Sequence, residues 1–197
     1  MTAISLSFNE VEFLSRKAAM GAGLPSGVAE ELGQAARWLA ARGFDGLAIV
    51  TDALESHSEG HGSSRHPAVE ALRLLDTLPA TDSTIPVDGA AIPPLLFLGL
   101  AGVLAGSEDI EVELRCDGVT LSTGDASVAN GHGNLVEPVT ALRRRPRQEL
   151  PAAVLARPHP VSRAVIDAAE RFAKRTYVPA SDASRHRGAG SAAGDND

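Results

Sequence analysis

The first part of the chain shows two runs of apolar residues at helical spacing. In the first run, Val11 to Ala19, apolar positions recur three and four residues apart, and the preceding Ser7–Glu10 pair is typical of a capping box. In the second run, Ser26 to Arg42, we expect Ser26 to cap the N-terminus and Gly43 to follow the C-terminus. The pattern predicts an antiparallel helical hairpin.

Three further segments are predicted to be helical. Leu47 to Glu55 combines a short apolar run with helical spacing, which favours a helix over a strand. Pro67 to Leu78 and Pro93 to Leu104 each begin with proline, a residue that suits the first turn of a helix. The third segment is apolar on nearly every side and is therefore a core element. Its Gly99 and Gly102 would allow another backbone to approach closely.

After the segment Pro93 to Leu104, the apolar residues recur every second position. Ile110 to Leu114 and Val119 to Leu121 alternate between apolar and polar residues, and Asp117-Gly118 stands between them. An Asp-Gly pair between two alternating runs is a strong signal for a β-hairpin. Two more extended segments are expected, over Asn134 to Leu142 and Ala152 to Leu155.

The order of these elements predicts an α+β fold. Val161 to Arg175 returns to helical spacing, so that helices come first, strands follow, and a helix comes last. We expect an N-terminal helical hairpin and further helices packed on a small, mainly antiparallel sheet, with a C-terminal helix and tail. The expected domain covers residues 5–179, and residues 180–197 form a Gly-, Ser- and Ala-rich tail that can fold back on it.

Composition limits the classes of protein to which the chain can belong. With 44% hydrophobic and only 4% aromatic residues, the core must consist mainly of Ala, Val and Leu. The single Cys116 excludes an internal disulfide, and a net charge of -7 makes nucleic acid an unsuitable partner. Met1 to Glu10 lacks a signal-peptide pattern, and Leu95 to Ala105 is shorter than the roughly 20 residues of a membrane span. We therefore expect a cytoplasmic protein with no membrane partner.

Half of the six histidines lie in one stretch, Glu55 to Pro67, and they are His57, His61 and His66. Imidazole is a good ligand for zinc, and His57 and His61 would share one face if the segment were helical. The Ser and Gly residues of this stretch instead favour a solvated loop. Metal binding, acid–base use of a histidine near neutral pH, and a loop without a ligand all stay open.

Arginines surround Pro146, and they are Arg143, Arg144, Arg145 and Arg147. Guanidinium groups match carboxylate and phosphate oxygens in pairs, so this cluster can bind an acidic partner or a phosphate. The alternative, which we favour, is an exposed connection between two elements that keeps the protein in solution.

Cys116 directly precedes the Asp117-Gly118 turn. Nucleophilic catalysis would require a neighbouring base, for which His132 is a candidate, to generate the thiolate. A structural thiol is the alternative, and we favour it.

The tail carries the residues of a possible anion or partner site, and these are Tyr177, Ser184, Arg185, Arg187, Gly188 and Gly190. Guanidinium groups, hydroxyls and glycine backbone amides are what a small anion site needs. The composition alone is also that of a disordered terminus, and both alternatives stay open.

Two stretches resemble an uncharacterised bacterial family, domain of unknown function 3726. They are SLSFNEVEFLSRKAAMGAGLPSGVAEELGQAARWLAARGFDG (Ser5 to Gly46) and TYVPASDASRHRGAGSAAGDND (Thr176 to Asp197). This resemblance implies no activity. Arg42 to Asp45 is also similar to the N-terminal region of the non-Rossmann malate and L-lactate dehydrogenases. Gly46-Leu47 stands where those enzymes need a Ser-His pair, so this likeness implies no catalysis.

Two functions are compatible with the sequence. In the first, the protein is a non-catalytic partner or accessory subunit of a cytoplasmic metabolic system that docks through its tail. In the second, it is a small metabolic enzyme or a binder of a carboxylate- or phosphate-bearing small molecule. That molecule would be held by Ser184, Arg185 and Arg187, with a catalytic group from the histidine stretch or from Asp45. We favour the first, because no nucleophile, base and orienting group can be assembled from the sequence.

Overall fold

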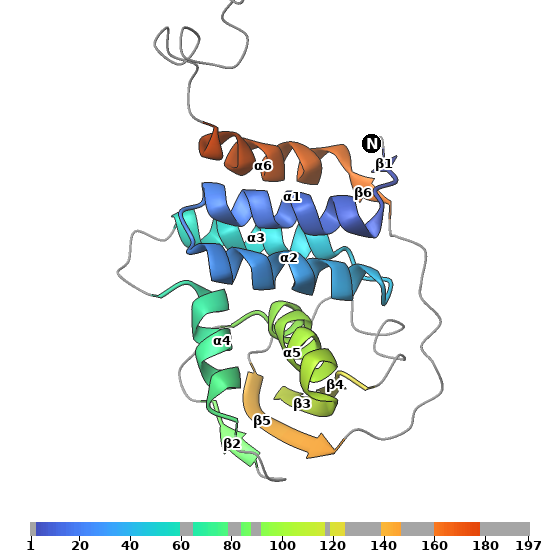
Figure 1. The fold of residues 1–197 in the computed structure, drawn as a ribbon, viewed down its shortest axis with the longest axis vertical. Helices are drawn as coiled ribbons and strands as arrows, with labels where there is room; N and C mark the ends of the chain where they lie inside the picture. The colour runs from blue at the N-terminus through green and yellow to red at the C-terminus, as the bar shows by residue number, and fades with distance from the viewer. Residues whose placement is uncertain are drawn as a thin grey trace, which may run out of the picture.

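The computed structural model describes residues 3–59, 65–78, 84–87, 92–116, 119–124, 139–146 and 160–177. Figure 1 shows helices α6, α1, α3 and α2 on one side of the molecule, α5 in the middle, and the larger sheet at the opposite end. This arrangement is an α+β fold, as predicted. In chain order the elements are β1 (Ala3–Ile4), α1 (Phe8–Gly21), α2 (Ser26–Ala40), α3 (Gly46–Glu59), α4 (Pro67–Asp76), β2 (Thr84–Pro86), α5 (Pro94–Glu108), β3 (Ile110–Cys116), β4 (Val119–Ser122), β5 (Val139–Pro146), β6 (Val161–Ser162), α6 (Arg163–Ala173) and η2 (Lys174–Thr176).

The predicted N-terminal hairpin is formed by α1 and α2. The capping box is confirmed. The Ser7 hydroxyl accepts a hydrogen bond from the Glu10 amide, and the Glu10 carboxylate accepts one from the Ser7 amide at 2.7 Å. Gly23 and Gly43 follow the two helices with φ of 89° and 85°, the left-handed conformation that closes a helix C-terminus. The predicted cap of α2 was wrong. Pro25 occupies the N-cap position, and the Ser26 side chain makes no capping hydrogen bond.

Helix α3 corrects the expected boundary of the histidine loop. The helix continues through His57 to Glu59, whereas the sequence placed a loop from Glu55 onward. The Ser58 hydroxyl donates to the Glu55 carbonyl at 2.8 Å, so a residue that was expected to break the helix instead satisfies its last turn. At the other end, the Asp45 carboxylate accepts the Ala48 amide at 3.0 Å and caps the helix.

Helix α5 is the central core element, as its composition predicted. A side chain at Gly99 would meet Leu39 and Ala35 of α2, and one at Gly102 would meet the Trp38 ring. Both glycines are thus closely approached, but by side chains of α2 and not by its backbone as predicted, and their lack of a side chain allows α2 to pack on α5.

The larger sheet has the strand order β2-β5-β3-β4, and every neighbouring pair is antiparallel. The predicted hairpin is formed by β3 and β4, with Leu114 opposite Leu121. The expectation of an exposed connection at the arginine cluster was wrong, because residues 143–146 belong to β5 in the middle of the sheet. The strand reaches from Val139 to Pro146, so it extends four residues beyond the expected end at Leu142.

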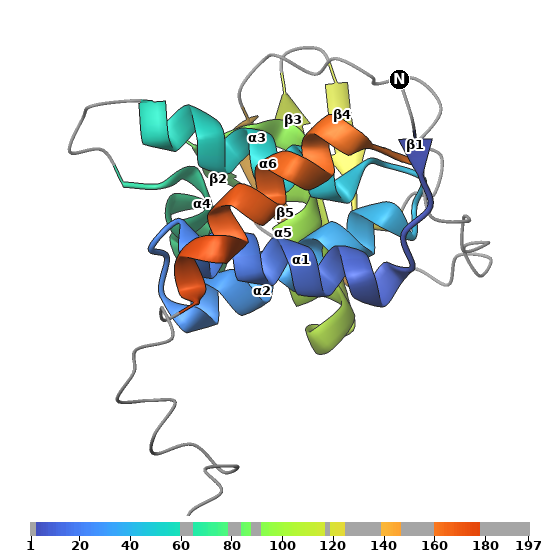
Figure 2. The same ribbon diagram turned by 90° about the horizontal axis from the view of Figure 1, so that it is seen from above.

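Helix α6 closes the structure against α1 (Figure 2). The Ser162 hydroxyl accepts the Val165 amide and caps the helix, and β6 just before it pairs with β1. Gly21, the last residue of α1, lies so close to the Phe172 carbonyl that a side chain there would meet the backbone of α6.

Candidate functional site

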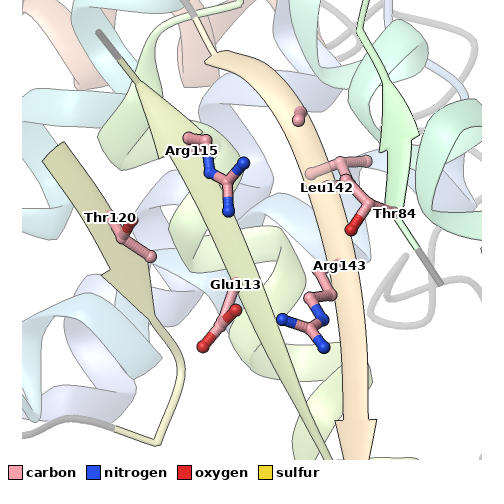
Figure 3. Close-up of a pocket in the computed structure, with 7 residues that line it drawn as sticks. Thr84, Glu113, Arg115, Thr120, Leu142 and Arg143 are labelled. Carbon is pink, nitrogen blue, oxygen red and sulfur yellow. The ribbon is translucent and has the colours of Figure 1, made fainter. Parts of the chain in front are cut away.

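The outer face of the larger sheet carries the candidate site. Val112, Leu114 and Cys116 of β3 are buried, and α5 packs on this strand. Because side chains alternate along a strand, Glu111, Glu113 and Arg115 point away from the core, and Arg115 is exposed. Figure 3 shows Glu113 and Arg115 together with polar side chains of the neighbouring strands.

Strand register brings side chains from four strands into two rows on this face. In one row, Glu113 lies opposite Ser122 on one side and Arg143 on the other, and Arg143 lies opposite Thr84. In the next row, Arg115 lies opposite Thr120 and Ala141. Because alanine ends at Cβ, the sheet surface is low at Ala141.

A shallow open depression, here called the sheet depression, forms around this low point. It encloses only about 10 Å³, room for about one water molecule, so a ligand would lie on the surface of the sheet and not inside a pocket. It is lined by Thr84, Glu113, Arg115, Thr120, Ala141, Leu142 and Arg143 (Figure 3).

Around the sheet depression the carboxylates have partners, whereas one arginine has no ion pair with a described residue. Glu113 forms an ion pair with Arg145 at 2.8 Å, and the Glu111 carboxylate accepts the Ser122 hydroxyl. Arg115 forms no ion pair with any residue that the structure describes. Arg115 thus offers a guanidinium group to a ligand beside the hydroxyls of two threonines, whereas Arg143 already has an interaction of its own and Glu113 already has a cation. This combination can hold a carboxylate or a phosphate.

His57 and His66 form a second, partly buried cluster. Their ring centroids lie 4.8 Å apart in an edge-on arrangement, so α3 and the start of α4 bring together two of the three predicted metal ligands. His61 lies outside the described residues. His66 is only 4% exposed, and burial together with the neighbouring His57 lowers the pKa of His66 to about 4. This imidazole is therefore neutral at physiological pH.

The capping role of His66 limits what its ring can bind. Nδ1 accepts the Ala68 amide at 3.1 Å, which makes His66 the N-cap of α4 and leaves the proton of the neutral ring on Nε2. Nε2 is buried and has no hydrogen-bond partner in the described part of the chain. A metal at Nε2 would need that nitrogen deprotonated, so coordination would require release of the Ala68 cap. The described residues contain no group of three potential ligands, and the three-histidine metal site stays a prediction.

Other candidate residues from the sequence are buried or are engaged in contacts that stabilise the fold. Cys116 is buried, and burial raises the pKa of its thiol, which opposes formation of a thiolate; His132 lies outside the described residues. Asp45 uses its carboxylate to cap α3. Arg144 pairs with Glu108 at 3.1 Å, whereas Arg147 lies outside the described residues.

Of the predicted tail site, the structure describes only Tyr177, which is 68% exposed at the end of η2. The other members lie outside the described residues, and these are Ser184, Arg185, Arg187, Gly188 and Gly190. The tail site therefore stays a prediction.

Comparison with known proteins finds a similarity for the N-terminal part of the chain. Residues 6–82 match the family described as protein of unknown function (DUF3726). The predicted resemblance is confirmed for the first of its two stretches, whereas the match does not reach Thr176 to Asp197, where the resemblance stays a prediction. No curated protein and no solved structure matches the chain. The DUF3726 match covers α1 to α4 and ends before β2, so the sheet depression lies entirely beyond it.

Sequence reasoning missed most of the sheet depression. It selected Arg143 as part of a basic run but did not select Thr84, Arg115, Thr120 or Ala141. The alternation of Glu111, Glu113 and Arg115 does place three charged side chains on one face of β3. Their neighbours on β2 and β5 depend on long-range strand pairing, for which the sequence has no local signal.

Proposed function

We propose that the protein is a non-catalytic binder of a small carboxylate- or phosphate-bearing molecule, which it holds in the sheet depression. The observation that carries the proposal is Arg115, which has no ion-pair partner among the described residues and lies beside the low point at Ala141. An antiparallel sheet with one face in water commonly carries charged residues, and those charges are usually matched across strands. Here Glu113 has an ion-pair partner, Arg145, whereas Arg115 has none in the part of the chain that the structure describes.

The chemistry of the lining favours binding over catalysis. Arginine stays protonated at every physiological pH and cannot act as a general base, and threonine hydroxyls are weak nucleophiles without one. The one carboxylate of the lining, Glu113, is held by Arg145 at 2.8 Å. The sheet depression therefore offers donors that fix an anion and no assembled acid–base pair.

An accessory-subunit role with docking through residues 180–197 stays a prediction, because these residues lie outside the described part of the chain. The cytoplasmic and bacterial setting expected from the sequence is part of the proposal. In the part of the chain that the structure describes, no helix is long and apolar enough to cross a membrane.

Replacing Arg115 tests the proposal. Isothermal titration with citrate and with inorganic phosphate is expected to give a dissociation constant of about 0.1–1 mM for the native chain. Arg115→Gln should weaken binding about tenfold or more, because a hydrogen bond to a charged group contributes about 1.5–3 kcal/mol. Stability should change by less than about 0.5 kcal/mol, since Arg115 is exposed.

Arg163→Gln is the matched control, because Arg163 is exposed on α6 and the substitution removes the same charge. Its affinity for both anions should equal that of the native chain. Equal binding by native protein and Arg115→Gln, or no binding of either anion, would refute the proposal.

A further inference from the structure

The outward face of α1 exposes two large apolar side chains. Phe13 is 51% and Met20 is 39% exposed, and together with Tyr177 they are the exposed large apolar residues of the described chain. Phe13 and Met20 lie seven residues apart, so they share one face of the helix. Val11, Ser15 and Ala18 of the opposite face are buried. The α1 face is therefore a helix surface that no described element covers.

The α1 face is negatively charged before Phe13 and positively charged after it. The helix has Glu10 in its first turn, and Arg16 and Lys17 follow Phe13 by three and four residues. Both cations lie 5.8 Å from the centre of the Phe13 ring. Arg16 also reaches Glu30 at 3.6 Å, but Lys17 has no carboxylate partner among the described residues. The α1 face is thus acidic at one end, basic at the other and aromatic between them.

We propose that the α1 face binds a second copy of this chain. Two copies of α1 that run antiparallel about a two-fold axis at Phe13 place the aromatic rings against each other. Glu10 lies about 4.5 Å before Phe13 along the helix axis and Lys17 about 6 Å after it, at the rise of an α-helix. The same axis therefore brings Glu10 of each copy opposite Lys17 of the partner subunit. Each contact occurs twice, which is the property of an isologous interface.

A second copy of the chain fits the α1 face better than a partner with charges of one sign. An acidic peptide or an anionic membrane would match Lys17 but would be repelled by Glu10. An antiparallel copy matches both ends. Glu10 can take part without losing its cap, because only one of its carboxylate oxygens accepts the Ser7 amide, at 2.7 Å.

One pair of helices buries less than the about 1,200–2,000 Å² of a standard interface, so we expect a weak dimer. Sedimentation equilibrium of the full chain should show a reversible monomer–dimer equilibrium with a dissociation constant on the order of 10–100 µM. Phe13→Glu should leave the protein monomeric at every concentration. Lys17→Glu should raise the dissociation constant about tenfold, because two like-charge pairs replace two ion pairs.

Lys174→Glu is the control for Lys17→Glu. It makes the same charge change at an exposed position outside α1 and should alter the dissociation constant less than twofold. Far-ultraviolet circular dichroism and the unfolding midpoint should be unchanged in all three variants, which separates loss of contact from loss of fold.

A disulfide trap provides a second readout. A residue on a two-fold axis faces its own copy, so Phe13→Cys should form a covalent dimer under mild oxidation. Ser107→Cys, at an exposed position of α5, should crosslink at least tenfold more slowly. The proposal is overturned if the native chain stays monomeric up to about 500 µM. Dimerisation that withstands Phe13→Glu, or equal crosslinking of the two cysteine variants, overturns it as well.

Discussion

Acidification from pH 7 to pH 4 is expected to remove about 3 kcal/mol of unfolding free energy through His66 alone. The pKa of His66 is about 4 in the folded protein, against 6.5 for the free side chain. Below pH 6.5 the unfolded chain binds more protons at His66 than the folded protein does. Proton binding therefore stabilises the unfolded state and lowers the free energy of unfolding. The contribution of His66 is therefore complete above pH 6.5 and is lost progressively as the pH falls toward 4.

Protonation of His66 destabilises the folded protein for two reasons, the burial of its ring and the capping role of its Nδ1. A charged imidazole would be buried beside His57, and its Nδ1 would become a donor that can no longer accept the Ala68 amide. The N-terminus of α4 would then lose its cap and also face a like charge at the positive end of the helix dipole.

His66→Asn isolates this effect, because asparagine caps a helix N-terminus but does not titrate. Urea denaturation at pH 7 and pH 4.5 should show a smaller loss of unfolding free energy for His66→Asn than for the native chain. Glu31 and Asp52, whose pKa values are raised by burial and neighbouring carboxylates, act in both proteins, so their contributions cancel in the comparison. The same pH dependence in both proteins would contradict the buried, capping role of His66.

Gly21→Ala is expected to destabilise the protein by about 3 kcal/mol, the second large effect. The added methyl group would meet the carbonyl of Phe172, which is backbone and cannot rotate away as a side chain can. Helix α6 also cannot move freely, since Ser162 caps it and β6 just before it is paired with β1. The substitution should therefore separate α1 from α6.

Gly106→Ala is the matched control, because Gly106 lies near the C-terminal end of α5 with nothing within 4 Å of the added atom. Alanine is the better helix former, so this variant should be unchanged or more stable by up to about 1 kcal/mol. Chemical denaturation at pH 7 measures both. A Gly21→Ala variant within about 0.5 kcal/mol of the native chain would show that α1 and α6 are not packed as described.

The helices could be predicted from the sequence because their signals are local. The Ser7–Glu10 box, the glycines after α1 and α2, and the apolar composition of α5 each act within a few residues of the element that they define. Gly46, by contrast, has a reason that lies in tertiary packing. A side chain there would meet the Ala36 carbonyl of α2, so glycine is required for α3 to approach α2.

The candidate site could be predicted only in part, because it depends on pairing between distant segments. Arg143 lies opposite Glu113 and Thr84 only after β5 has paired with both β3 and β2, and nothing near Arg143 in the sequence specifies that register. In the same way, His57 and His66 meet because the end of α3 approaches the start of α4. The sequence left a metal site open for these histidines, favoured a solvated loop, and did not indicate a buried helix cap.

The most direct test of anion binding is an NMR titration of the isotope-labelled full chain with citrate and phosphate. Binding in the sheet depression should give saturable amide shifts at Thr84, Arg115, Thr120 and Ala141, with the α1 amides unchanged and the shifts lost in Arg115→Gln. Shifts that are absent, or that are spread evenly over exposed cationic residues such as Arg163 and Lys174, would contradict it.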